Sequence, residues 1–178
     1  EDPYIPGLSP LSLSADQVLC THGHKDHSAA HLVKLTGTAP TFTVEGLDTF
    51  HDPEQGRLRG PNRMYLVSTE GMRLLHVGDL GCRPSDEQMA QLHGVDVLLV
   101  PVGGHYTIDA AQAQALTEEI QPRIVVPMHY RSDTFSYEVL ATVEDFLALR
   151  HDVVRYDTDT LEVTKDTPAQ TAVLRYLG

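Results

Sequence analysis

The chain has 178 residues, of which 41% are hydrophobic and 21% are charged, a balance typical of one globular domain. Its 25 acidic residues outnumber 13 basic ones, and the formal net charge of −12 disfavours general binding to nucleic acids or anionic membranes. The sequence has no run of roughly 18 apolar residues that could cross a bilayer and no secretory signal pattern. Two cysteines, Cys20 and Cys82, are too few for a disulfide framework. We therefore expect a single soluble domain in a reducing cytoplasm.

The first part of the chain contains a histidine-rich segment and a long loop. The apolar residues 18–20 predict the end of a buried strand directly before THGHKDH, residues 21–27. Residues 28–37 predict a short helix, and residues 40–44 alternate like a strand. The polar, Gly- and Pro-rich residues 48–62 predict a loop of about 15 residues, which is long enough to suggest a function.

The rest of the chain alternates strands and helices. A hairpin is predicted from strands at 63–68 and 72–77, and uniformly apolar, buried strands at 95–102 and 123–127. Helices are predicted from Ser85, at 107–119 and at 136–149, and short strands near 152–156, 160–164 and 171–176. This order indicates an α/β fold.

The segment 21–27 has the composition of a metal site. His22 and His24 stand two residues apart, so in extended backbone their imidazoles point the same way and could meet one ion. Asp26 and His27 follow, and imidazole nitrogen with carboxylate oxygen suits Zn, Fe, Mn or Ni. A catalytic metal usually has at least three protein ligands, so further ligands must come from distant segments. The candidates are His51, His76, Asp79, His105 and His129.

Several segments, taken together in chain order, resemble the metallo-β-lactamase superfamily. They are THGHKDH, the loop TFHDPEQGRLRGPN with His51, HVGDLG with Asp79, and PMHY with His129. The stretch PVGGHYTIDAAQA followed by IVVPMHY resembles one branch of that superfamily, the small metal-dependent hydrolases related to L-ascorbate-6-phosphate lactonase. The resemblance extends from Asp2 to about Arg131.

The resemblance implies an αβ/βα four-layer sandwich, with two β-sheets face to face and helices outside. Relatives begin with strands that precede the position of Asp2, so residues 1–178 would form one domain that lacks the first N-terminal strands. An open sheet edge of that kind would favour pairing with a second copy of the chain, and a homo-oligomer is therefore plausible.

The resemblance also implies a binuclear centre that holds two divalent ions, zinc first, with Mn, Fe or Ni as alternatives. The first ion would take His22, His24 and His51, the second would take Asp26, His27 and His129, and Asp79 would bridge both. A hydroxide between the ions would attack a small ester, lactone or phosphoester, and Asp26 would orient it or move its proton. Asp2 would hydrogen-bond a ligand histidine and fix its tautomer.

Other polar residues have two possible roles. Substrate contact or simple loop exposure is expected for His105, Tyr106 and Tyr130, and phosphate or carboxylate binding or plain solvation for Arg59, Asn62 and Arg131. His76 is a rival ligand, but if Asp79 faces the metals then a strand residue three positions earlier should face away. Cys82 could tune the metals, although a packed bystander is the favoured interpretation.

Rival functions remain open at this point. Relatives with the same ligands cleave RNA, but the acidic charge and the lack of a basic or aromatic RNA-binding segment argue against a nuclease or phosphodiesterase. Oxygen reduction would need a flavin domain that the sequence lacks, whereas sulfur oxidation at a single iron is compatible with it. The non-enzymatic alternative is a metal-binding scaffold without catalysis.

Overall fold

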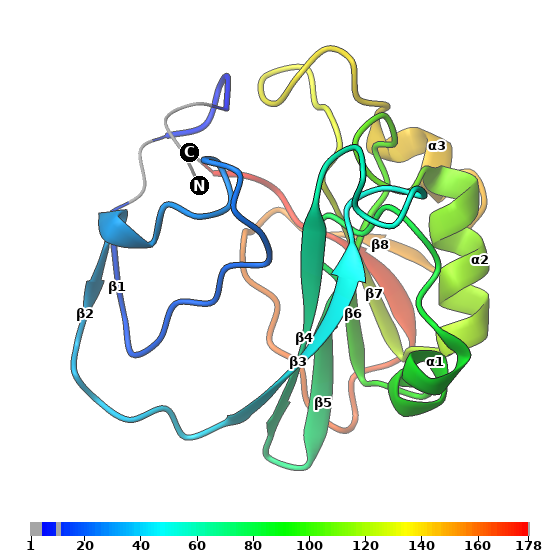
Figure 1. The fold of residues 1–178 in the computed structure, drawn as a ribbon. Coiled ribbons are helices and arrows are strands. Elements are labelled where there is room, and N and C mark those ends of the chain that lie inside the picture. Colours follow the sequence, from blue (N-terminus) through cyan, green and yellow to red (C-terminus); the bar gives the residue numbers. More distant parts are fainter. Residues whose placement is uncertain (1–4, 10–11, 178) are drawn as a thin grey trace.

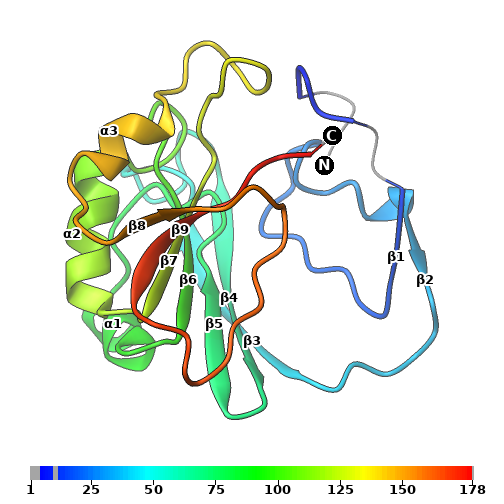
Figure 2. The same ribbon diagram turned by 180° about the vertical axis from the view of Figure 1, so that it is seen from behind.

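A seven-stranded sheet with helices on one side dominates the computed structural model, which describes residues 5–9 and 12–177. Figure 1 shows the three α-helices along one side of this sheet and a small two-stranded sheet on the other side. Figure 2 shows the same arrangement from behind. Among the described residues, no helix is long and apolar enough to cross a membrane.

The secondary structure elements have the following bounds. The large sheet contains β3 (Thr43–Phe50), β4 (Pro61–Thr69), β5 (Met72–His76), β6 (Val97–Pro101), β7 (Ile124–Met128), β8 (Val153–Arg155) and β9 (Gln170–Val173). The α-helices are α1 (Asp86–Leu92), α2 (Ala110–Ile120) and α3 (Val143–Leu147). The small parallel sheet pairs β1 (Leu13–Ala15) with β2 (Val33–Leu35), and a 3-10 helix (Ala30–Leu32) precedes β2.

The hydrophobic core lies between the large sheet and its helices. Leu75 of β5 and Leu98 of β6 are fully buried, and they belong to one cluster with Leu92, Ile120 and Phe146 of the three helices. Burial of each such side chain contributes roughly 1.5–3 kcal/mol. Because strand side chains alternate, the opposite face carries a smaller cluster, around Val97, Ile124 and Ala172.

Two helices begin where the sequence predicts, because both have complete capping boxes. The Ser85 side chain accepts a hydrogen bond from the backbone N–H of Gln88, whose side chain accepts one from Ser85 N–H. Asp109 and Gln112 make the same reciprocal pair at the start of α2. Each pair satisfies two N–H groups that would otherwise lack partners.

The strand directions bring several chain segments to one edge of the sheet. β3, β4 and β5 are antiparallel in turn, so β3 and β5 run the same way, and β5, β6 and β7 are parallel. The carboxyl ends of β3, β5, β6 and β7 therefore meet at one edge. The residues that follow these ends include His51, Asp79, His105 and His129.

The hairpin β4–β5 and the buried strands β6 and β7 are confirmed, but two predictions near the N-terminus are wrong. Residues 18–20 form no strand, and Leu19 is exposed. The helix predicted at 28–37 is one 3-10 turn followed by β2, since Val33, Lys34 and Leu35 pair with β1. Tertiary pairing outweighs the weak helical preference of this short segment.

Two predictions near the C-terminus also differ from the structure. The helix predicted at 136–149 is reduced to α3, because Ser136 has a φ of 77° and its N–H donates to Pro6 O at 2.9 Å. No strand forms at 160–164, where the Thr164 N–H donates to Thr167 Oγ1 at 2.8 Å instead of to a neighbouring strand. Local side-chain hydrogen bonds compete here with regular structure.

Gly103→Ala tests how tightly the segments at the strand ends are packed. A Cβ at Gly103 would lie 2.2 Å from His129 O, so we expect a loss of about 1–3 kcal/mol in the free energy of unfolding. The matched control is Gly46→Ala, whose Cβ would meet only the flexible Arg63 side chain, at 3.0 Å; its effect should stay within about 0.5 kcal/mol. Urea denaturation measures the unfolding free energy of both variants. Equal losses in the two would contradict the packing argument.

Candidate metal centre

The histidine-rich segment lies along β4 and is attached to it by hydrogen bonds. Arg63 N–H donates to Thr21 O at 2.8 Å, and the Tyr65 hydroxyl donates to Cys20 O at 2.8 Å. The chain then turns, with His27 N–H donating to His24 O at 3.0 Å. These contacts, rather than a preceding buried strand, bring the segment to the strand ends.

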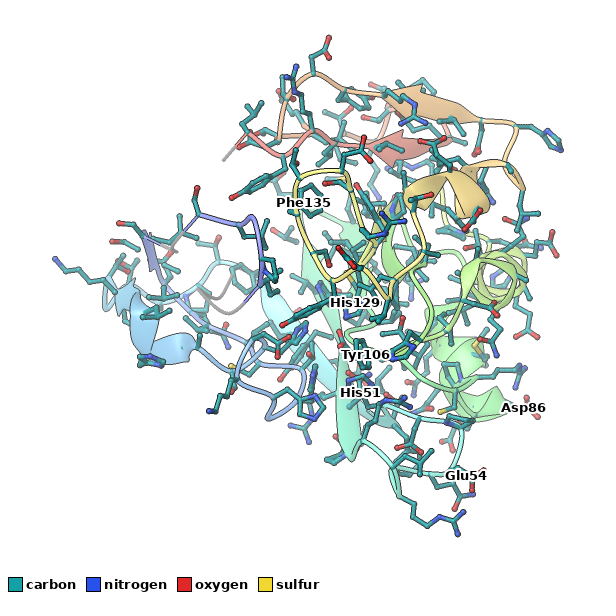
Figure 3. The ribbon with its side chains drawn as sticks, turned by 90° about the horizontal axis from the view of Figure 1, so that it is seen from above. His51, Glu54, Asp86, Tyr106, His129 and Phe135 are labelled. Atoms are coloured by element: carbon teal, nitrogen blue, oxygen red, sulfur yellow. The ribbon has the colours of Figure 1, made fainter. Side chains whose placement is uncertain are left out.

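His51, Asp79 and His129 reach the same place from the carboxyl ends of β3, β5 and β7. Gly81 N–H donates to Phe50 O at 3.0 Å, which joins the segments after β3 and β5. His129 has a φ of 54°, a left-handed conformation that ends β7 and that non-glycine residues rarely adopt. Figure 3 shows His51, His129 and Tyr106 gathered at the centre, whereas Glu54 and Asp86 lie at the periphery.

Asp79 is the point on which the imidazoles converge. Its Oδ2 atom lies 3.2 Å from His51 Nε2, 3.3 Å from His129 Nε2, 3.5 Å from His27 Nε2 and 3.8 Å from His22 Nε2. One carboxylate oxygen is thus surrounded by four imidazole nitrogens. The carboxylate and the imidazoles are therefore close enough to act together as ligands.

Two groups of three side chains could each hold one ion. The first contains His22, His24 and His51, and the second contains His22, His27 and Asp79; within each group the donor atoms lie within 4.8 Å of one another. Asp26 Oδ2 lies 3.6 Å from His27 Nε2, and the His27 and His129 rings stack at 6.0 Å. The structure therefore brings together all seven side chains that the sequence marks as ligands.

Burial and charge shift the pKa values of His22, His27 and Asp79 toward the forms that bind metal, and shift that of His129 the other way. Burial lowers the pKa of His22 to about 4, although Asp79 opposes the shift, and burial also lowers the pKa of His27. Burial would lower the pKa of His129 too, but its hydrogen bond to Asp79 raises it. Burial would raise the pKa of Asp79, yet hydrogen bonds from His129 and His51 hold it below its usual range. A neutral imidazole and an ionised carboxylate are the forms that bind metal.

Three buried imidazole nitrogens test whether an ion fits here. Among the described residues, His22 Nε2, His51 Nδ1 and His129 Nδ1 have no hydrogen-bond partner. A buried polar atom without a partner is costly, and native proteins rarely keep one without a reason. A divalent cation beside Asp79 would satisfy His22 Nε2, which lies 3.8 Å from Asp79 Oδ2, so the imidazole and carboxylate donors fit a metal ion there. His51 and His129 turn Nε2 toward Asp79, so the same cation would not reach their Nδ1 atoms.

Asn62 supports the centre through a hydrogen bond with the backbone of Asp79. It is only 1% exposed, and its Oδ1 accepts a hydrogen bond from Asp79 N–H at 3.0 Å. Its Nδ2 donates to Thr49 Oγ1 and to Val77 O, both at 2.9 Å. Gly78, with a φ of 61°, leaves room for this amide, since a Cβ there would lie 2.4 Å from Asn62 Oδ1. The sequence predicted phosphate or carboxylate binding or plain solvation for Asn62; its burial shows that solvation is wrong, and its role in fixing Asp79 was missed.

Asp52 organises the loop that follows His51 and was not predicted from the sequence. Its buried carboxylate accepts backbone N–H groups from Glu54, Gly56, Leu58 and Arg59, at 2.7–3.1 Å. Burial alone would raise the pKa of Asp52, but these four hydrogen bonds lower it. An Asp-Pro pair followed by Gly is a signal for such a turn.

A cavity of about 260 Å³ opens over the cluster. Arg59, Tyr106 and Tyr137 line it together with ligand candidates. The Arg59 guanidinium lies over the Tyr106 ring at 5.8 Å and donates to His105 O at 3.1 Å. The ring centroids of His105 and Tyr106 are 4.4 Å apart. His105 therefore contacts two lining residues but does not itself line the cavity.

The other candidates lie beside the cluster or away from it. His76 accepts a hydrogen bond from Gly78 N–H at its Nδ1 and belongs to neither ligand group, while Tyr130 lines a second cavity next to the first. Cys82 lines two other cavities that contain none of the seven ligand candidates, which supports a packing role. Arg131 donates to Leu140 O. Asp2 lies outside the described residues.

Comparison with known proteins identifies the family. Residues 2–129 match the family described as "Beta-lactamase superfamily domain". A UPF0173 metal-dependent hydrolase of Thermoplasma acidophilum is 30% identical, and the alignment covers 85% of this chain and 80% of that protein. The chain belongs to the metallo-β-lactamase superfamily. A second superfamily relative, a UPF0173 metal-dependent hydrolase of Thermococcus onnurineus, is 28% identical. That alignment covers 74% of this chain and 76% of that protein.

Solved structures agree with this assignment to the metallo-β-lactamase superfamily. A protein of Thermotoga maritima, assigned as a Zn-dependent hydrolase of that superfamily, has a TM-score of 0.76 and 30% identity, and covers 92% of this chain and 84% of its own. A protein of Parabacteroides distasonis, assigned as a metal-dependent hydrolase, has 18% identity and a TM-score of 0.58. This similarity supports the fold alone. The predicted superfamily and fold are confirmed, whereas the closer relation to L-ascorbate-6-phosphate lactonase stays a prediction.

His22→Ala tests the metal centre, because His22 belongs to both ligand groups. We expect its zinc affinity, measured by isothermal titration calorimetry, to fall at least tenfold. The control is His31→Ala, which removes an exposed imidazole of the 3-10 helix and should leave affinity unchanged. Circular dichroism checks that both variants fold, and equal zinc affinity of the two would contradict the assignment.

Asn62→Ala tests the support of Asp79. The substitution removes the acceptor for Asp79 N–H and the donor to Val77 O, so we expect a loss of about 2–3 kcal/mol in unfolding free energy. Zinc affinity should also fall by about 10–100-fold, because Asp79 is no longer held in place. Gln91→Ala, which removes an exposed amide of α1, is the control. Unchanged zinc affinity in a folded Asn62→Ala protein would refute the positioning role.

Proposed function

We propose that the protein is a metal-dependent hydrolase that cleaves a small ester, lactone or phosphoester. The observation that carries the proposal is a cluster of five histidines and two aspartates, all of which except the buried His22 line one cavity: His22, His24, His27, His51, His129, Asp26 and Asp79. Relatives named as metal-dependent hydrolases support it. The cavity volume of about 260 Å³ suits a small substrate better than a polymer.

We infer that the seven side chains would divide into two sets that share Asp79. His22, His24 and His51 would hold one divalent cation, and Asp26, His27 and His129 a second, with zinc first and Mn, Fe or Ni as alternatives. When bound, such cations would lower the pKa of water and polarise the carbonyl or phosphoryl oxygen of the substrate. The distances from Asp79 Oδ2 to its four imidazoles support a shared ligand.

The chain itself orients the reactants and moves the protons. Asp26 is a quarter exposed and lines the cavity, so its carboxylate can accept a proton from the attacking water. The water oxygen then bonds to the acyl carbon or the phosphorus, the bond to the leaving oxygen breaks, and the leaving oxygen takes up a proton. Arg59 and Tyr106 lie at the polar side of the cavity, where they can bind the leaving group.

The proposed activity is tested with 4-nitrophenyl acetate, a γ-lactone and bis(4-nitrophenyl) phosphate. We expect the zinc-loaded protein to hydrolyse at least one of them and to lose the activity when EDTA removes the metal. Asp26→Asn should lower kcat by about 10²–10⁴-fold, because the proton acceptor is lost.

The control for Asp26→Asn is Asp133→Asn, which changes an exposed carboxylate in the loop after β7. Elemental analysis measures the metal content of each variant, so that loss of metal is separated from loss of the proton acceptor. A fully metal-loaded protein that cleaves none of the three substrates would favour the non-catalytic scaffold instead.

A further inference from the structure

A second cavity, of about 440 Å³, adjoins the metal-ligand cluster. It shares Asp26, His27, Asp79 and His129 with the first cavity, so the same side chains form part of both walls. The cluster therefore lies between two cavities. A substrate whose reacting atom sits at the cluster can extend into both.

The wall of the second cavity beyond the cluster is mainly apolar and aromatic. Its members are Ile5, Leu8, Pro127, Met128, Tyr130, Phe135 and Tyr176, with His76 and Ser136 as the polar residues. The Tyr130 and Phe135 ring centroids are 6.2 Å apart, and those of Phe135 and Tyr176 are 5.4 Å apart. Three aromatic rings thus form one continuous surface.

Hydrogen bonds hold this aromatic wall together from segments far apart in sequence. Phe135 N–H donates to Ser132 Oγ at 3.1 Å, and Ser136 N–H donates to Pro6 O at 2.9 Å. Ser9 N–H donates to Tyr176 Oη at 2.6 Å. Figure 3 shows Phe135 in the loop after β7, on the same side of the molecule as His129.

The two cavities differ in chemistry. The first is lined by Arg59, Tyr106 and Tyr137, whereas the second has no Lys or Arg among its described lining residues. We propose that the second cavity binds an apolar acyl or aryl group of the substrate, so that the enzyme prefers esters with a hydrophobic acid portion of several carbons. This inference rests on the proposed hydrolase function. The volume lies within the range of about 300–1,000 Å³ that accommodates small organic ligands.

The test is a chain-length series of 4-nitrophenyl esters, from acetate through butyrate and hexanoate to octanoate, with zinc-loaded protein. Each methylene that leaves water for the cavity should raise kcat/KM roughly three- to fourfold until the cavity is full. Phe135→Ala removes the central ring of the wall, so the hexanoate-to-acetate ratio of kcat/KM should fall about tenfold. Phe135→Leu, which keeps an apolar side chain, should recover most of the ratio.

Leu161→Ala is the matched control. It removes apolar surface from a separate groove on the sheet face, which shares no residue with the ligand cluster, and should leave the ratio unchanged. Calorimetric binding of acetate and hexanoate anions, the products of the reaction, gives a readout without turnover. Hexanoate should bind at least tenfold more tightly than acetate, and Phe135→Ala should reduce this preference.

The outcomes separate this inference from the proposed function. Hydrolysis of all esters with a chain-length ratio near one would overturn the apolar subsite and leave the hydrolase standing. Tighter binding of hexanoate without hydrolysis of any ester, of the lactone or of the phosphodiester would support the subsite and overturn the proposed function. Equal binding of both anions together with no hydrolysis would overturn both.

Discussion

The common direction of four strands is the constraint on which the site depends. Because β3, β5, β6 and β7 run the same way, the residues that leave their carboxyl ends meet at one edge of the sheet. These residues include His51, Asp79 and His129, which lie far apart in the sequence. The ladder of hydrogen bonds between paired strands brings them close together. The core between the sheet and the helices stabilises that ladder, so a cluster of mutually repelling, poorly solvated groups can persist at its end.

Asp79 links the fold to the chemistry. Asn62 holds its backbone, Gly78 provides the space for that amide, and four imidazoles surround its carboxylate. The cluster of imidazoles around a single ionised oxygen leaves buried nitrogens without partners in the protein itself. Unpartnered imidazole nitrogens beside an ionised carboxylate favour the binding of a cation. Two cavities of different polarity adjoin this cluster.

The sequence predicted the parts of this structure that follow from local pattern. The capped helices at Ser85 and Asp109, the hairpin and the apolar strands β6 and β7 each carry a strong local signal. The ligand candidates were found because the histidine-rich segment is unusual and the family motifs occur in order. The positioning roles of Asn62 and Asp52 were missed, since they depend on hydrogen bonds to main-chain groups that periodicity does not reveal. Short segments such as 28–37 were mispredicted because partners distant in sequence decide their conformation.

The loop after His51 is held almost entirely through main-chain N–H groups that donate to Asp52. Every amino acid except proline offers such a group, so side chains at Glu54, Leu58 and Arg59 can change without loss of the loop's path, whereas Gly56 has little room for one. Natural variation can therefore change the side chains of this loop, including Arg59 in the wall of the first cavity, while the cluster of ligand candidates beside it stays the same.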